Sequence, residues 1–196
     1  MNVFIFDNKI IAPNKCGTRF LKKIFKNYEE TNHYEIPNLE NCFLIIRNPF
    51  EHFKTSLYTE ILGLIENNKN LDKNFTLSYN TIKKYFDITL DRHKFNNGHF
   101  SSDLYRKLYF YKVKNNCNVV ELIDLSDLIK KLGFEYKYQK EDYDFSNKNY
   151  KQKDEFYEEI KTNFTAEIER IENWIKIEMI YFNNLKQNNI NNFKII

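Results

Sequence analysis

The sequence has few of the residues that punctuate or cross-link a chain. Its 196 residues include four glycines, three prolines and three cysteines. The cysteines, Cys16, Cys42 and Cys117, are odd in number and widely spaced, which gives neither a disulfide framework nor the ligand spacing of a zinc site. No apolar run approaches the roughly 18 residues of a membrane span, and residues 1–7 lack the basic start of a secretory signal. We therefore expect a soluble, cytoplasmic protein that has no membrane partner.

A large charge of one sign is also missing. The formal net charge is +3 at pH 7, and basic residues are interleaved with acidic ones. So small an excess does not predict nucleic acid as a partner, although it suits a modest positive field around an anionic ligand. With 42% hydrophobic and 17% aromatic residues, the chain is expected to fold rather than stay disordered. Its length suits one domain with a substantial core, expected over 1–187, followed by a frayed, Asn-rich tail at 188–196.

Short apolar runs alternate with segments of helical periodicity. This pattern predicts a single α/β domain with a mostly parallel central sheet, flanked by helices, and a helical C-terminus. The turn-like sequence Asp7-Asn8-Lys9 between the first two runs also allows a hairpin. Strands are expected at Val3–Phe6, Ile10–Ala12, Phe43–Ile46 and Val119–Ile123, with a short further one near His33–Ile36. Helices are expected at Thr18–Asn27, Phe50–Asn67, Leu77–Leu90, Ser126–Leu132, Asp154–Asn163 and Thr165–Asn183, while Leu104–Val113 is a helix or, given its aromatic residues, a strand.

The segment Ile10–Leu21 has the pattern of a strand end, a tight turn and a helix start. A turn of this kind, Asn14-Lys15-Cys16-Gly17, aims backbone N–H groups at one point beyond the strand. The helix N-terminus adds partial positive charge there, and Lys15 adds a full charge. We interpret the segment as a phosphate-binding loop. It is not a Walker A loop, because Gly-x-x-x-x-Gly-Lys-Ser/Thr is missing and the lysine precedes the glycine.

A second motif lies at Cys42–Tyr58. Its four apolar residues predict a buried strand, Arg47 stands at the C-terminal end of that strand, and Pro49 suits the first turn of a helix. The hydroxyls of Thr55 and Ser56 lie on this helix, and a guanidinium fork with a hydroxyl suits a second phosphate group. Ligands of α/β sheets bind beyond the carboxyl ends of the strands, so both motifs fall where a ligand would be expected.

Taken together, the two motifs resemble the sulfotransferases that use 3′-phosphoadenosine 5′-phosphosulfate (PAPS). That family pairs a Pro-Lys-x-Gly-Thr-like loop for the 5′-phosphosulfate with an Arg-Asn/Asp-Pro…Ser segment for the 3′-phosphate, and the match here covers residues 9–60. The resemblance implies a P-loop-like sulfotransferase fold, PAPS as donor, 3′-phosphoadenosine 5′-phosphate (PAP) as product, and no metal. It assigns the 5′ side to Lys15, Cys16, Gly17, Thr18 and Arg19, and the 3′-phosphate to Arg47, Thr55 and Ser56.

Two positions depart from the pattern of that family. The family's serine falls eight residues after the arginine, a position that is Thr55 here, with Ser56 one residue later. A threonine hydroxyl can donate the same bond. His52 stands where several carbohydrate-acting members carry a second arginine.

Transfer to a hydroxyl requires a base that removes the acceptor's proton. A histidine suits this role, and a carboxylate with a raised pKa can replace it. The resemblance suggests His33, which lies between the motifs and precedes a proline as the catalytic histidine of some sulfotransferases does. It suggests His99 as the next candidate, because its loop Asn97-Gly-His-Phe-Ser-Ser resembles the acceptor loop of carbohydrate sulfotransferases. A glutamate such as Glu60 is the third candidate. This loop and the Arg-Asn-Pro sequence favour a carbohydrate acceptor.

The loop before the C-terminal helices is a further candidate. Lys148 and Lys151 resemble the basic loop that closes over the 3′-phosphate and adenine in many sulfotransferases. Two other classes stay open. A nucleoside-phosphate kinase with an atypical loop would need an aspartate after a strand to hold Mg²⁺, for which Asp124 is the candidate. A non-catalytic module would keep the nucleotide-binding fold without the base.

Overall fold

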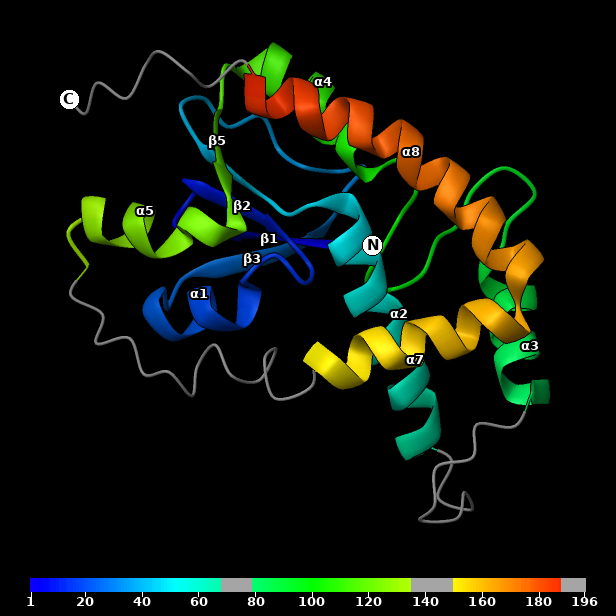
Figure 1. Cartoon of the computed structure of the whole chain (residues 1–196). Coiled ribbons are helices and arrows are strands. Elements are labelled where there is room, and N and C mark those ends of the chain that lie inside the picture. The colour runs from blue at the N-terminus through cyan, green and yellow to red at the C-terminus, as the bar shows by residue number, and fades with distance from the viewer. Residues whose placement is uncertain (68–78, 135–149, 188–196) are drawn as a thin grey trace.

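The computed structural model describes residues 1–67, 79–134 and 150–187. It is an α/β fold built on one five-stranded mixed sheet with strand order β3-β1-β2-β4-β5 (Figure 1). β2–β4 and β4–β5 are parallel pairs, whereas β1 is antiparallel to both β2 and β3. The expectation of a mostly parallel sheet was therefore wrong. The strands are β1 (Asn2–Phe6), β2 (Ile10–Pro13), β3 (Tyr28–Asn32), β4 (Phe43–Ile46) and β5 (Asn118–Glu121).

The antiparallel half of the sheet begins with the turn between β1 and β2. Asp7 and Asn8 adopt the left-handed conformation, with φ of 47° and 53°, which these two residue types tolerate better than other non-glycine residues. The Lys9 N–H donates to the Phe6 carbonyl oxygen at 2.9 Å and closes the turn. The hairpin that the sequence allowed is the one observed.

The third strand lies upstream of its predicted position. The sequence suggested a strand near His33–Ile36, but β3 ends at Asn32. β3 is an edge strand whose side chains are exposed or half-buried. It therefore lacks the alternation of apolar and polar residues by which a half-buried strand is found.

The helices agree with the predicted elements to within a few residues at their ends. Leu104–Val113, which was left between helix and strand, is helical within α4. The helices are α1 (Thr18–Ile24), α2 (Pro49–Asn67), α3 (Tyr79–Thr89), α4 (Leu104–Asn115), α5 (Leu125–Lys131), α7 (Tyr150–Asn163) and α8 (Thr165–Gln187), with a 3₁₀ turn η1 (Leu122–Asp124) before α5. Of the helices in the described ranges, none is both long and apolar enough to cross a membrane.

Alternating side chains of the sheet form two cores. Ile5 and Leu44 belong to the face that packs against α4 and α8. Phe6 and Ile45 belong to the opposite face, which packs against α1 and α5. Figure 1 shows these helix pairs on opposite sides of the sheet. Helices thus cover both faces, as the sequence predicted.

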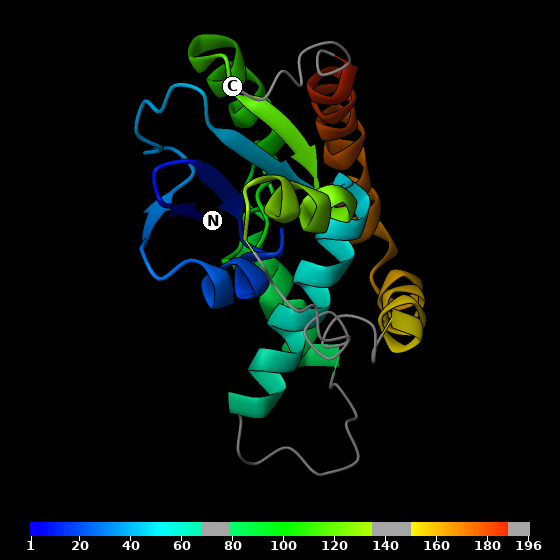
Figure 2. The same cartoon turned by 90° about the vertical axis from the view of Figure 1, so that its left-hand side faces the viewer.

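A third core lies outside the sheet. Phe53 and Leu57 of α2 pack with Phe86 of α3 and with buried residues of α7 and α8, among them Ile168. Figures 1 and 2 show α2, α3 and α7 extending away from the sheet as a helical lobe. Phe100, from the loop between α3 and α4, is fully buried in this core. That loop is therefore anchored where the helical lobe meets the sheet.

Candidate functional site

Three parallel strands end at one edge of the sheet. Because β2, β4 and β5 run in the same direction, the loops that follow them, at 14–17, 47–48 and 122–124, all leave from this carboxyl edge. β1 begins here as well, and the Asn14 N–H donates to the Asn2 carbonyl oxygen at 3.1 Å. Both sequence motifs therefore open onto the same edge.

The Lys15 loop (residues 14–17) is a turn with left-handed backbone at two positions. Lys15 has a φ of 63°, and Gly17, where α1 begins, has a φ of 80°. A side chain at Gly17 would be strained by this φ, and its Cβ would lie 2.6 Å from Cδ2 of Leu125. The Cys16 N–H donates to the Pro13 carbonyl oxygen at 3.0 Å. That amide is used inside the turn and does not point at a ligand.

Arg47 reaches from the end of β4 to the Lys15 loop. Its Nη1 donates a hydrogen bond of 3.1 Å to the Lys15 carbonyl oxygen. The carbonyl oxygen of Arg47 in turn accepts a hydrogen bond from the buried Tyr105 hydroxyl. The two motifs therefore meet at one place, which we call the basic corner (Lys15, Arg19 and Arg47).

The amine of Lys15 lies among like charges. Burial and then the Arg19 guanidinium are the main causes that lower the pKa of Lys15 from 10.5 to about 8, with a smaller contribution from Arg47. The Glu60 carboxylate acts in the opposite direction. An anion held here would offset the neighbouring cations and favour the charged amine again.

His99 and Glu60 form an acid–base pair beside the basic corner. Nδ1 of His99 contacts Oε1 of Glu60 on α2, and both side chains are partly exposed. The backbone N–H of His99 donates to Oδ1 of Asn97 at 2.7 Å, and the Asn14 side chain donates to the Gly98 carbonyl oxygen at 3.1 Å. The His99 loop is thus tied to the Lys15 loop. The carboxylate fixes a proton on Nδ1 and leaves Nε2 able to accept one.

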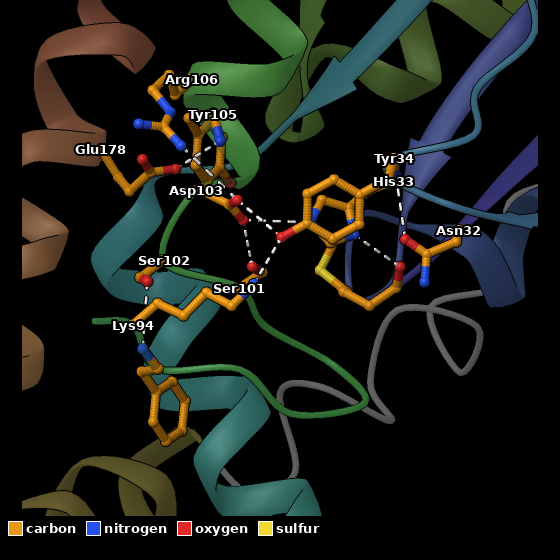
Figure 3. Close-up of polar contacts among 12 residues, drawn as sticks. Asn32, His33, Tyr34, Lys94, Ser101, Ser102, Asp103, Tyr105, Arg106 and Glu178 are labelled. Atoms are coloured by element: carbon orange, nitrogen blue, oxygen red, sulfur yellow. Dashed lines mark hydrogen bonds and ion pairs between the residues drawn. The ribbon is translucent and has the colours of Figure 1, made fainter. Parts of the chain in front are cut away.

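His33 lies in a different cluster at the same edge, drawn in Figure 3. Its ring is buried, with Nδ1 3.1 Å from the Met1 carbonyl oxygen and Nε2 3.2 Å from Oδ1 of Asp103. Asp103 also accepts hydrogen bonds from Ser101 and from the Tyr34 hydroxyl. Hydrogen bonds from His33, Ser101 and Tyr34 lower the pKa of Asp103, although its burial alone would raise it.

This geometry does not support His33 as a base. Both ring nitrogens already face oxygen partners inside the fold, the Met1 carbonyl oxygen and the Asp103 carboxylate. Neither nitrogen is therefore directed at a substrate. Among the described residues, the ring of His99 contacts the Glu60 carboxylate through Nδ1 alone, and its side chain is partly exposed.

Other predicted ligands are used by the protein itself. The Thr55 hydroxyl donates to the Glu51 carbonyl oxygen at 2.9 Å, within α2. Ser56 is fully buried, and its hydroxyl lies 2.8 Å from the His52 carbonyl oxygen and 3.1 Å from that of His99. The prediction that these hydroxyls hold a phosphate is therefore not supported.

Cys16 fills the turn as a buried side chain. Burial raises the pKa of its thiol to about 12, so the group is not a reactive thiolate. Thr18 is buried at the start of α1, whereas Arg19 is exposed. Lys148 lies outside the described residues, and the side chain of Lys151 does too. The basic corner is thus formed by charged side chains and not by the thiol.

A cavity of about 340 Å³ lies beside β5. Glu121 and Asp124 line it together with Lys186 of α8, but the residues of the basic corner do not. Asp124, the residue on which a magnesium-dependent kinase would depend, is exposed. Within 1–67, 79–134 and 150–187, no three His, Cys, Asp or Glu side chains form a group that could hold a metal ion.

We compared the chain with models of known families, with curated proteins and with solved structures, and none of the three comparisons gave a match. The chemistry of the residues at the carboxyl edge is therefore the basis for assigning a function.

Proposed function

We propose that this protein is a sulfotransferase that moves the sulfuryl group from PAPS to an acceptor hydroxyl, with a carbohydrate as the favoured acceptor. The observation that carries the proposal is the hydrogen bond from Arg47 to the Lys15 carbonyl oxygen. It joins two cation-bearing loops at the ends of neighbouring parallel strands. The negative charges of a nucleotide with phosphate groups at both its 3′ and 5′ positions complement the positive charges of these two loops.

In this proposal the two loops have separate tasks. Lys15 and Arg19 hold the 5′-phosphosulfate, and Lys15 neutralises the charge that builds on the bridging oxygen as the phosphate leaves. Gly17 lets the ligand approach the backbone closely because it has no side chain. Arg47 holds the 3′-phosphate with the N–H groups of its fork that do not bind the Lys15 loop.

His99 acts as the base in the transfer step. The acceptor oxygen attacks sulfur while the bond from sulfur to the bridging oxygen breaks, and the electron pair leaves on that oxygen beside Lys15. The acceptor's proton passes to Nε2 of His99. Glu60 holds Nδ1–H in place and stabilises the imidazolium that forms, which is the task of the acidic member of a catalytic triad. The chain's contribution is otherwise to orient the two reactants.

Thermal unfolding with PAP tests the binding part of the proposal. A ligand that binds only the native state raises Tm, by roughly 5–10 °C for a protein of this size at about 100 times Kd. Lys15→Ala and Arg47→Ala should each reduce the shift, measured against the same variant without PAP. Arg106→Ala is the matched control, because Arg106 is an exposed arginine beside Asp103 and not in the basic corner.

The outcomes separate the three classes. No shift in the wild type would rule out the proposal, and equal shifts in all variants would mean that PAP binds elsewhere. A shift without sulfuryl transfer to any hydroxyl would indicate a non-catalytic nucleotide-binding module. Transfer activity from PAPS that persists in EDTA would separate sulfuryl transfer from magnesium-dependent phosphoryl transfer.

A further inference from the structure

A buried histidine connects the loops of the candidate site. His52, in the first turn of α2, is fully buried. Its Nδ1 lies 3.1 Å from the Tyr105 hydroxyl, and its Nε2 lies 3.1 Å from the His99 carbonyl oxygen. The Tyr105 hydroxyl continues the chain by donating to the Arg47 carbonyl oxygen.

This chain of contacts needs more protons than a neutral ring supplies. The carbonyl oxygens of Arg47 and His99 at its two ends can only accept. Between them lie the contacts Arg47 to Tyr105, Tyr105 to His52, and His52 to His99. Tyr105 brings one hydroxyl proton and a neutral imidazole brings one N–H. One nitrogen of a neutral His52 therefore faces an oxygen with no hydrogen between them.

The surroundings of the ring favour its neutral form. Burial, followed by the Arg47 guanidinium and more weakly by Lys15, lowers the pKa of His52 to about 3. The backbone groups of Asn14 and His99 act in the opposite direction. The rings of Phe100 and Tyr105 also pack against the imidazole, both edge-on. Burial raises the pKa of Tyr105 well above its usual value, so this neighbour stays an uncharged donor.

We propose that His52 is a positioning residue for the candidate site and that it takes up a proton when a multiply charged anion binds the basic corner. The anion offsets the charges of Arg47 and Lys15, so a second proton on the ring costs less. The charged ring then completes all the hydrogen bonds of the chain and holds the three loops in one arrangement. The inference rests on the proposed function only in requiring that the corner bind an anion.

Proton uptake has a consequence for affinity. Because binding and protonation are linked, the affinity for the anion must rise as the pH falls towards the range in which the ring titrates. A role limited to packing would not produce this coupling. The phosphate groups of a ligand also titrate near pH 6, so the contribution of His52 must be measured as a difference between variants.

Isothermal titration calorimetry with PAP at about pH 6, in two buffers of different ionisation enthalpy, measures the uptake. We expect the wild type to take up a larger fraction of a proton per PAP than His52→Gln. Gln keeps a polar side chain without a titrating group. Tyr105→Phe should lower the uptake as well, because a neutral His52 then needs only its bond to His99.

Each outcome decides the inference. Equal uptake in the wild type and His52→Gln, with PAP bound by both, overturns the inference but leaves the proposed function in place. No binding of PAP by the wild type overturns both. Should His52→Gln fail to fold, ¹⁵N NMR of the wild-type ring gives the answer directly. Two protonated nitrogens with PAP and one without it support the inference, and an unchanged ring contradicts it.

Discussion

His33 and His99 lie near the same edge of the sheet and each faces a carboxylate, yet their surroundings differ. His33 is buried, both of its ring nitrogens have partners, and Asp103 is satisfied by several donors. The side chain of His99 is 30% exposed, and within the described residues only Nδ1 has a recorded partner, Glu60. Both ring nitrogens of His33 are used inside the fold. Among the described residues, Nε2 of His99 has no such partner, and this ring lies beside the basic corner.

The difference separates a structural role from a functional one. A cluster in which every donor meets an acceptor stabilises the fold and has no capacity left for a ligand. A cluster of positive charges beside a ring nitrogen that has no partner in the fold is stabilised when an anion binds to it. Substitution in the His33 cluster should therefore lower the stability of the fold, whereas substitution of His99 should lower the rate of transfer.

The largest expected effect is on the rate of transfer. His99→Asn should lower the rate of sulfuryl transfer by about 10²–10⁴, the usual contribution of a general base, and should leave the Kd of PAP nearly unchanged. Steady-state kinetics together with PAP titration measures both quantities. Equal losses of rate in His99→Asn and in a folded His33→Asn would remove the distinction between the two clusters.

The complementary substitution acts on stability. Asp103→Asn leaves the buried His33 without its carboxylate partner and should lower the free energy of unfolding by roughly 3 kcal/mol. Because the pKa of Asp103 is lowered in the fold, its carboxylate stabilises the wild type above its unfolded pKa of 3.8. That contribution is lost as the pH falls below this value. Urea unfolding should show the difference in unfolding free energy between the two proteins narrowing from pH 7 to pH 3 without disappearing, because pH 3 is still above the lowered pKa of Asp103. PAP affinity should not change. A constant difference would contradict this account.

Two lysines allow a finer comparison of the clusters. The pKa of Lys15 is lowered to about 8 by burial and Arg19, whereas a hydrogen bond to the Tyr34 hydroxyl raises the pKa of Lys94. Only the uncharged amine is acylated, so limiting acetic anhydride at pH 8 should modify Lys15 at least about tenfold faster than Lys94. Mass spectrometry of the digested protein gives both rates. PAP should protect Lys15 alone, and protection of Lys94 would place the ligand elsewhere.

The smallest effect concerns the backbone of the Lys15 loop. Gly17 and Gly133 have φ of 80° and 78°, but a Cβ collides with Leu125 only at Gly17. Gly133→Ala should therefore cost about 1 kcal/mol for the left-handed backbone, and Gly17→Ala roughly 1 kcal/mol more. Only Gly17→Ala should also weaken PAP binding. Equal losses of unfolding free energy in the two variants, measured by thermal unfolding, would show that Leu125 does not pack tightly against Gly17.

The sequence was sufficient for the parts of the structure that follow from local patterns. The strand before each motif, the turn around Lys15 and Gly17, and the placement of Arg47 at a strand end were all predicted from apolar runs and turn residues. β3 was misplaced because an exposed edge strand has no apolar alternation. The direction of β1 depended on whether Asp7 and Asn8 close a hairpin, and the sequence left this open.

The side-chain partners at the site depended on contacts distant in sequence. The pairing of His33 with Asp103 and of His52 with Tyr105 joins residues separated by 70 and 53 positions. No sequence pattern within a single segment indicates that two such distant residues are in contact. The hydroxyls of Thr55 and Ser56 were assigned by resemblance, and only the structure shows that backbone carbonyl oxygens already use them. A histidine where a second arginine was expected was the one signal for the buried network.

The most direct test of the account compares three ligands on three proteins. Calorimetric Kd values for PAP, adenosine 5′-phosphate and adenosine 3′-phosphate would be measured with the wild type, Lys15→Ala and Arg47→Ala. If the basic corner holds one nucleotide by both phosphates, Lys15→Ala weakens PAP and adenosine 5′-phosphate but not adenosine 3′-phosphate. Arg47→Ala then weakens PAP and adenosine 3′-phosphate but not adenosine 5′-phosphate. Equal losses for all three ligands, or none for any, would contradict it.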